Sequence, residues 1–252
     1  MRKVFLSLLL LLTAFTMLEA QDNRRIRYRA DMGFYDEDYV PGAQRLVGNV
    51  AFAQDNVRGY CDSAYLYDAD NYIIAFGDKV RIFVGDSVKL YGRRAYYDGD
   101  AKVASIAVAV RLEKGDAFLL SDSLIYDTKN DVGYYLTGGQ LVNDEDTMTS
   151  QEGWYYTKTD DAIANYDVLL WNKTYRVDCE SLKYNAASKI AYFISRTHLH
   201  SDDQDIYTSS GWYDTEKEIT TLAQDVQLFD GPRSVIADSI YYNRPDSMGR
   251  AW

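Results

Sequence analysis

A repeat of about 29 residues runs through most of this chain and constrains its fold more than any other feature. Most copies carry Asp, Glu or Ser, then three residues, then a tyrosine usually followed by Asp, Asn or Thr. The anchor tyrosines that this motif indicates are Tyr35, Tyr67, Tyr97, Tyr126, Tyr156, Tyr184, Tyr213 and Tyr242. One such unit cannot bury an apolar face alone, so about eight copies are expected to stack around a continuous core.

A second, apolar anchor follows all but the last of these tyrosines after 12 to 15 residues. These anchors are Val50, Val80, Val110, Leu141, Val168, Leu199 and Val226. Gly, Asn and Asp gather between the two anchors, for example at 68–71 and 98–101, and favour tight turns. Each copy is therefore two extended segments of about ten residues separated by turns, and 23 Tyr against 3 Pro fits such strands. We predict an all-β fold.

The first twenty residues have the pattern of a secretory signal peptide. Arg2 and Lys3 precede an apolar run from Val4 to Met17, and Ala20 follows. This run is shorter than the roughly 20 residues of a membrane-spanning helix, although a membrane anchor remains the alternative. We predict a signal peptide at 1–20 and one repeated domain at 21–252. The repeats stop ten residues after Tyr242, so the chain is either a fragment or open to a partner at this end.

The charge balance restricts the class of partner. Without residues 1–20, which hold two of the 27 basic and one of the 38 acidic residues, 25 basic and 37 acidic residues remain, a net charge of −12. Nucleic acids and anionic membrane surfaces require neutralisation by Lys and Arg. We therefore predict no nucleic-acid partner.

The two cysteines occupy nearly the same place in their repeats. Cys61 and Cys179 lie four repeats apart, and two strands per repeat at about 4.8 Å each would separate them by tens of ångströms. A disulfide needs Cα atoms within about 7 Å of each other. We predict two free thiols.

Gly-Asn-Val strands that alternate with Ala-Asp-x-x-x-Tyr-Asp strands resemble the OstA-like family. The local matches are residues 46–52, 61–68 and 121–127, and the resemblance extends over nearly all of the chain after residue 20. The family includes the periplasmic lipopolysaccharide-transport bridge LptA and the N-terminal periplasmic part of the outer-membrane translocon LptD. The resemblance implies a stacked antiparallel β-jellyroll, also called a β-taco. It also implies a lipid conduit in the periplasm, in contact with the outer membrane.

The family resemblance also implies a site. Its interior groove holds the acyl chains of lipopolysaccharide, and protomers or other transport proteins join end to end at open sheet edges. Transferred onto this sequence, the groove-lining candidates are Tyr67, Tyr97, Leu124, Tyr126, Trp154, Tyr156, Leu182, Tyr184, Tyr213, Val50, Val80, Val110, Leu141, Val168 and Val226. The residues alone leave one alternative open, because a packed β-solenoid without lipid cargo needs the same apolar positions.

Other chemistry finds little support in the sequence. His198 and His200 share one strand face about 7 Å apart without an evident third ligand, so we expect solvent-facing histidines and no metal site. Carboxylates recur in turns at repeat intervals, as turn formers do, although an exported carbohydrate-active β-helix remains a third alternative. We predict no catalytic residues, no cofactor and no enzyme activity.

Overall fold

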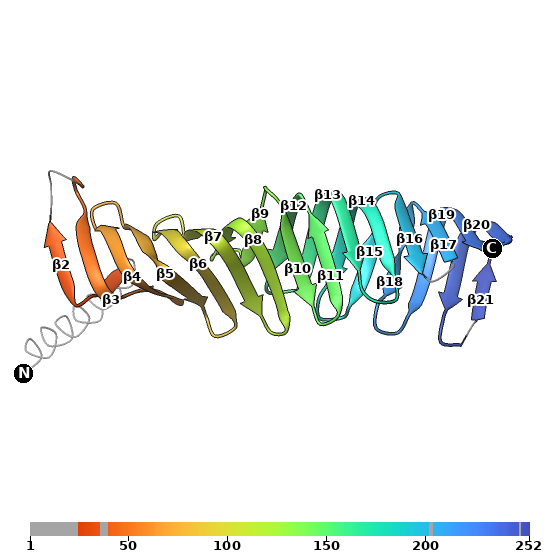
Figure 1. Cartoon of the computed structure of the whole chain (residues 1–252), viewed down its shortest axis with the longest axis horizontal. Helices are drawn as coiled ribbons and strands as arrows, with labels where there is room; N and C mark the ends of the chain where they lie inside the picture. The colour runs from red at the N-terminus through yellow and green to blue at the C-terminus, as the bar shows by residue number, and fades with distance from the viewer. Residues whose placement is uncertain (1–24, 36–39, 202–203, 247) are drawn as a thin grey trace, which may run out of the picture.

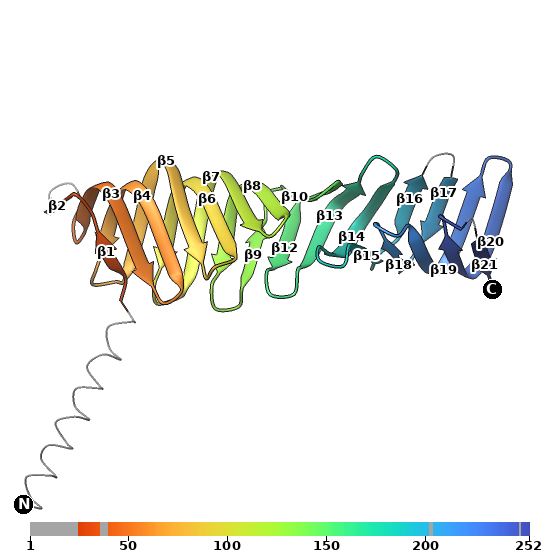
Figure 2. The same ribbon diagram turned by 90° about the horizontal axis from the view of Figure 1, so that it is seen from below.

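The computed structural model describes residues 25–35, 40–201, 204–246 and 248–252. All regular secondary structure in this part is β-strand, and every strand pair is antiparallel, which confirms the predicted fold class. The strands stack side by side into an elongated body, with β1 and β2 at one end and β20 and β21 at the other (Figures 1 and 2). The predicted signal peptide lies outside the described residues. In the described part, no helix has the length and apolar character to cross a membrane.

Ten strands are long enough to run through both layers of the molecule. They are β3 (Gln44–Gln54), β4 (Val57–Tyr67), β5 (Tyr72–Val84), β6 (Val88–Asp98), β7 (Val103–Lys114), β8 (Ala117–Asp127), β13 (Asp161–Trp171), β14 (Arg176–Asn185), β19 (Ile219–Asp230) and β20 (Arg233–Asn243).

The other strands are shorter. They are β1 (Arg27–Arg29), β2 (Met32–Tyr35), β9 (Val132–Tyr135), β10 (Gly139–Asn143), β11 (Asp146–Ser150), β12 (Glu152–Tyr156), β15 (Ile190–Phe193), β16 (Thr197–Ser201), β17 (Gln204–Thr208), β18 (Ser210–Asp214) and β21 (Met248–Ala251). Most come in consecutive pairs, such as β9 with β10, that together replace one long strand.

A corner in the middle of each long strand divides the stack into two layers. The pairing register shifts there, for example between Ala107 and Val110, as in a β-bulge. Val108 and Ala109 take φ values of 69° and 54°, and the pair Gln224 and Asp225 repeats this left-handed geometry in β19. Two successive left-handed residues redirect the strand, so its two halves belong to different layers.

The turns between strands form two rows. Turn row A (68–71, 99–102, 128–131, 157–160, 186–189 and 215–218) joins strands within one layer, which we call layer I. Turn row B (55–56, 85–87, 115–116, 144–145 and 172–175) joins strands within the other, layer II. Side chains alternate between buried and exposed along the strands of both layers, as in the pattern of β4. The buried side chains of the two layers form one apolar cluster that extends from Ile26 to Ile240.

Candidate functional site

Most of the predicted groove-lining residues point into this shared interior. Twelve of the fifteen are buried, with at most 6% of their surface exposed: Tyr97, Leu124, Tyr126, Leu182, Tyr184, Tyr213, Val50, Val80, Val110, Leu141, Val168 and Val226. They come from both layers and pack in the same apolar cluster. Their inward position agrees with the sequence analysis, and lipid contact at these residues stays a prediction.

Three predicted residues lie on the outer face instead. Tyr67 and Trp154 are only partly buried, and Tyr156 is 37% exposed, whereas its neighbour Tyr155 is fully buried. Successive strand residues point to opposite faces, so an error of one position moves a side chain from the interior to the surface. Constant spacing would have revealed the right register at Tyr155.

The buried tyrosines follow a strict spacing. Positions 97, 126, 155, 184 and 213 are each 29 residues apart, and all five rings are buried. Four of the hydroxyls reach polar partners near the turns: Tyr97 donates to Gln54 at 2.8 Å, Tyr126 bonds Thr157 at 2.8 Å, Tyr155 donates to Asp160 at 3.0 Å and Tyr184 donates to Asp146 at 2.9 Å. A side chain with an apolar ring and a polar tip suits this border between the core and the turns.

Turn rows A and B meet along one edge of the molecule, which we call the seam. Lys102 of row A forms an ion pair with Asp55 of row B at 2.6 Å, and Lys114 beside row B forms another with Asp160 of row A. The Gln54 side chain donates to the Gly99 carbonyl at 3.0 Å. Because each partner lies about one and a half repeats from the other, these contacts tie the two layers together over long sequence distances.

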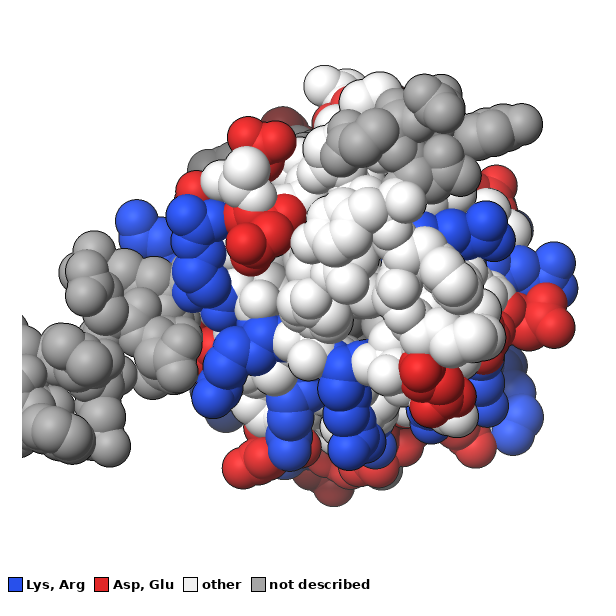
Figure 3. Space-filling model, turned by 90° about the vertical axis from the view of Figure 1, so that its left-hand side faces the viewer, with Lys and Arg blue, Asp and Glu red and all other residues white. Residues whose placement is uncertain are grey.

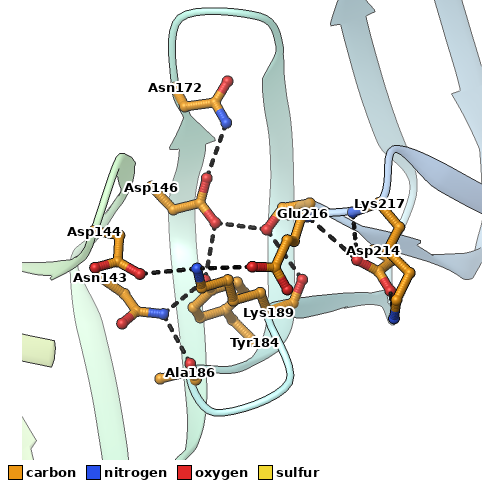
Figure 4. Close-up of polar contacts among 11 residues, drawn as sticks. Asn143, Asp144, Asp146, Asn172, Tyr184, Ala186, Lys189, Asp214, Glu216 and Lys217 are labelled. Atoms are coloured by element: carbon orange, nitrogen blue, oxygen red, sulfur yellow. Dashed lines mark hydrogen bonds and ion pairs between the residues drawn. The ribbon is translucent and has the colours of Figure 1, made fainter. Parts of the chain in front are cut away.

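Asp146 is the most heavily bonded group at the seam (Figure 4). Its carboxylate is 6% exposed and accepts hydrogen bonds from Tyr175 at 2.7 Å, Tyr184 at 2.9 Å and Thr215 at 2.6 Å. Asn172 adds a fourth at 3.0 Å. Tyr175 and Asn172 belong to the row B side, whereas Tyr184 and Thr215 belong to the row A side, so one carboxylate links both layers.

A second set of contacts extends this closure. Lys189 bridges the seam to Asp144 at 2.8 Å and contacts Glu216 at 3.4 Å along its own row (Figure 4). The hydrogen bond to Asp144 raises the pKa of Lys189, which therefore stays charged. Asn143 donates across the seam to the Ala186 carbonyl at 2.8 Å. The described part of the seam is therefore closed by polar contacts, and side chains fill the interior behind it.

The remaining candidates carry no evident reactive chemistry. Both cysteines are free, as predicted, and burial raises the pKa of Cys61 to about 11 and that of Cys179 to about 12. His198 and His200 lie on the outer face and share the Asp205 carboxylate at 2.7 and 3.0 Å. Their hydrogen bonds lower the pKa of Asp205. The described residues contain no group of three or more His, Cys, Asp or Glu side chains suited to hold a metal ion.

The end that carries β1 and β2 exposes apolar side chains. Met32, Phe34 and Tyr35 are 53%, 49% and 70% exposed on this edge. Figure 3 looks onto this end and shows an uncharged area in the middle, with Lys and Arg side chains along part of its border. The opposite end exposes Met248 and Trp252 beside the last strand, β21. Both ends therefore combine an open strand edge with exposed apolar surface.

The fold and the interior together define a class of protein: a two-layered stack of antiparallel strands around a continuous apolar core with apolar ends. The chain belongs to the OstA-like protein family, whose model matches residues 24–180. Among solved structures, the chain is similar to LptH from Pseudomonas aeruginosa, the LptA-homologous periplasmic component of a lipopolysaccharide transport device. The identity is 17%, the match covers 42% of this chain and 79% of that chain, and the TM-score is 0.38. No curated protein matches the chain significantly.

Proposed function

We propose that this chain is a periplasmic carrier that holds the acyl chains of lipopolysaccharide, or of another acylated lipid, between its two layers. In this role it bridges toward the outer membrane and serves lipopolysaccharide transport and outer-membrane assembly. Membership of the OstA-like family supports the class of cargo. The observation that carries the proposal is the single apolar cluster along the whole stack, from Ile26 to Ile240.

The interior suits acyl chains by its chemistry. Its inward positions are Val, Leu, Ile, Ala and tyrosine rings, and burial of apolar surface contributes about 25 cal/mol per Å² without directional constraint. An acyl chain between the layers would exchange one set of apolar contacts for another. Polar contacts confined to the seam would let the two turn rows separate while each layer keeps its strand pairing.

The two ends suit continuation of the stack. We propose that they join other transport proteins or a second copy of this chain, because open strand edges offer backbone hydrogen bonds and the exposed Phe34 and Met248 offer apolar contacts. Such joins would extend the apolar interior from one protein to the next.

Site-specific photo-crosslinking in a Gram-negative periplasm tests the carrier function. A photoreactive phenylalanine analogue replaces Tyr126, which is fully buried, and as the matched control it replaces Ile125, which points outward. We expect a lipopolysaccharide adduct at position 126 and none at 125. A folded, exported protein that gives no adduct at either position would refute the proposal.

A packed β-solenoid that acts as a structural or interaction protein is the second candidate. The closed seam favours it, since Asp146 and Lys189 hold the layers together in the described conformation. The two candidates differ in uptake: a carrier takes up lipid or detergent into the interior, whereas a solenoid takes up neither.

A further inference from the structure

The outer face of layer II is cationic in its N-terminal half, although the chain as a whole carries a net charge of −11. Pairing registers place Arg58 opposite Phe83, Tyr60 opposite Arg81, and Arg81 opposite Tyr91 on neighbouring strands. Basic and aromatic side chains thus alternate along this face. We call its basic members the cationic ladder: Arg27, Arg29, Arg58, Arg81, Lys89 and Arg111.

The ladder is segregated from acidic side chains. On these two rows of the outer face, from β1 to β7, the only carboxylate is Glu113, which forms an ion pair with Arg111 at 2.6 Å. Asp86 of the neighbouring turn approaches Arg58 at 3.4 Å, but its side chain is fully exposed. The rows themselves hold six cations and one carboxylate, so they attract an anion on a molecule whose surface otherwise repels one.

Aromatic rings shape two hollows between these cations. The first is lined by Arg58, Tyr60, Arg81 and Phe83, and the second adjoins it through Arg58 and Tyr60 and extends to Arg27. The Arg81 guanidinium lies over the Tyr60 ring, 5.5 Å from its centroid. This stacking holds the flat guanidinium beside the hollow and leaves its N–H groups available for a ligand.

This combination of groups fits a phosphorylated sugar. Guanidinium groups bind phosphate oxygens through paired N–H donors, and aromatic faces offer apolar surface to the C–H faces of sugar rings. The ladder also lies near the seam, because Arg58 is two residues after the turn at Asp55 and Asn56 and Lys89 is two residues after the turn at 85–87. We propose that the cationic ladder binds the phosphorylated sugar head group of a lipid whose acyl chains lie between the layers. This inference rests on the proposed function.

Binding of a deacylated, phosphorylated lipopolysaccharide oligosaccharide to the chain without residues 1–20 tests the ladder. The test variant carries Arg58→Gln and Arg81→Gln. The control carries Arg176→Gln and Arg196→Gln, two basic side chains outside the ladder, so the loss of charge is the same. Titration calorimetry measures the dissociation constant, and thermal unfolding checks that both variants fold.

We expect at least a tenfold weaker Kd for the ladder variant, less than a twofold change for the control, and weaker binding for all proteins in high salt. The dephosphorylated oligosaccharide should bind poorly to all three. Equal effects of the two variants, or equal affinity for the dephosphorylated sugar, would overturn the proposal. So would full competition by inorganic phosphate or by a single-stranded oligonucleotide at matched phosphate concentration.

The cross-linking experiment separates this inference from the proposed function. If only the ladder is wrong, the ladder variant with the photoreactive group at position 126 gives the lipid adduct of the parent protein, and its affinity for the sugar does not change. If the carrier function is wrong, position 126 gives no adduct even in the parent protein.

Discussion

Replacement of Asp146 by alanine probes the closure of the seam directly. The carboxylate accepts hydrogen bonds from the hydroxyls of Tyr175, Tyr184 and Thr215, all of which are buried. Thr215 keeps an acceptor in the variant, since its hydroxyl also lies 3.0 Å from the Lys189 carbonyl. Tyr175 and Tyr184 would each lose the acceptor of a buried hydroxyl.

The magnitude follows from these two hydroxyls. A buried donor without a partner costs about 1–3 kcal/mol, so two such donors cost about 2–6 kcal/mol. Removal of the buried charge offsets part of this loss, because the carboxylate no longer has to be desolvated. We expect Asp146→Ala to lower the free energy of unfolding by about 3 kcal/mol. Asp146→Asn retains one oxygen acceptor and should cost less.

Urea unfolding followed by tryptophan fluorescence measures the change as a shift of the midpoint at constant slope. The matched control is Asp144→Ala, on the same turn. Its side chain is 51% exposed and pairs with Lys189, so its loss should cost at most about 1 kcal/mol. If Asp146→Ala and Asp144→Ala shift the midpoint equally, the carboxylate does not hold the seam and the reasoning fails.

Further predictions follow from the buried groups. Gly59→Ala should destabilise by about 1–3 kcal/mol, because its Cβ would lie 2.0 Å from the Phe52 ring, and the added change Phe52→Leu should restore part of the midpoint. Burial raises the pKa of Tyr126 to about 12, so stability should be intact below pH 10 and fall between pH 10 and 12; an unchanged urea midpoint would contradict this. Cys61 and Cys179 should react with a disulfide reagent at pH 8 at least about a hundredfold faster in denaturant than in the native state, and similar rates would exclude their burial.

The sequence by itself determined the all-β class, the repeat and the free thiols. Alternation with a period of two, turn-forming residues and stacked copies are local features, so they can be read along the chain without knowledge of distant contacts. The same pattern placed Val110 and Tyr126 correctly in the interior. It failed at Tyr155, because the motif tolerates a shift of one residue and only pairing with β9 and β13 decides which neighbour faces inward.

Only the tertiary structure decided how the interior is bounded. Asp146 meets Thr215 from 69 residues away, and Gln54 meets Gly99 from 45 residues away. No local pattern links such pairs, since they meet only after the corners have folded one layer over the other. The cationic ladder likewise joins Arg58 and Arg81 through cross-strand pairing. Periodicity along the chain specifies the strands, whereas register between strands and closure of the two layers specify the surfaces on which function depends.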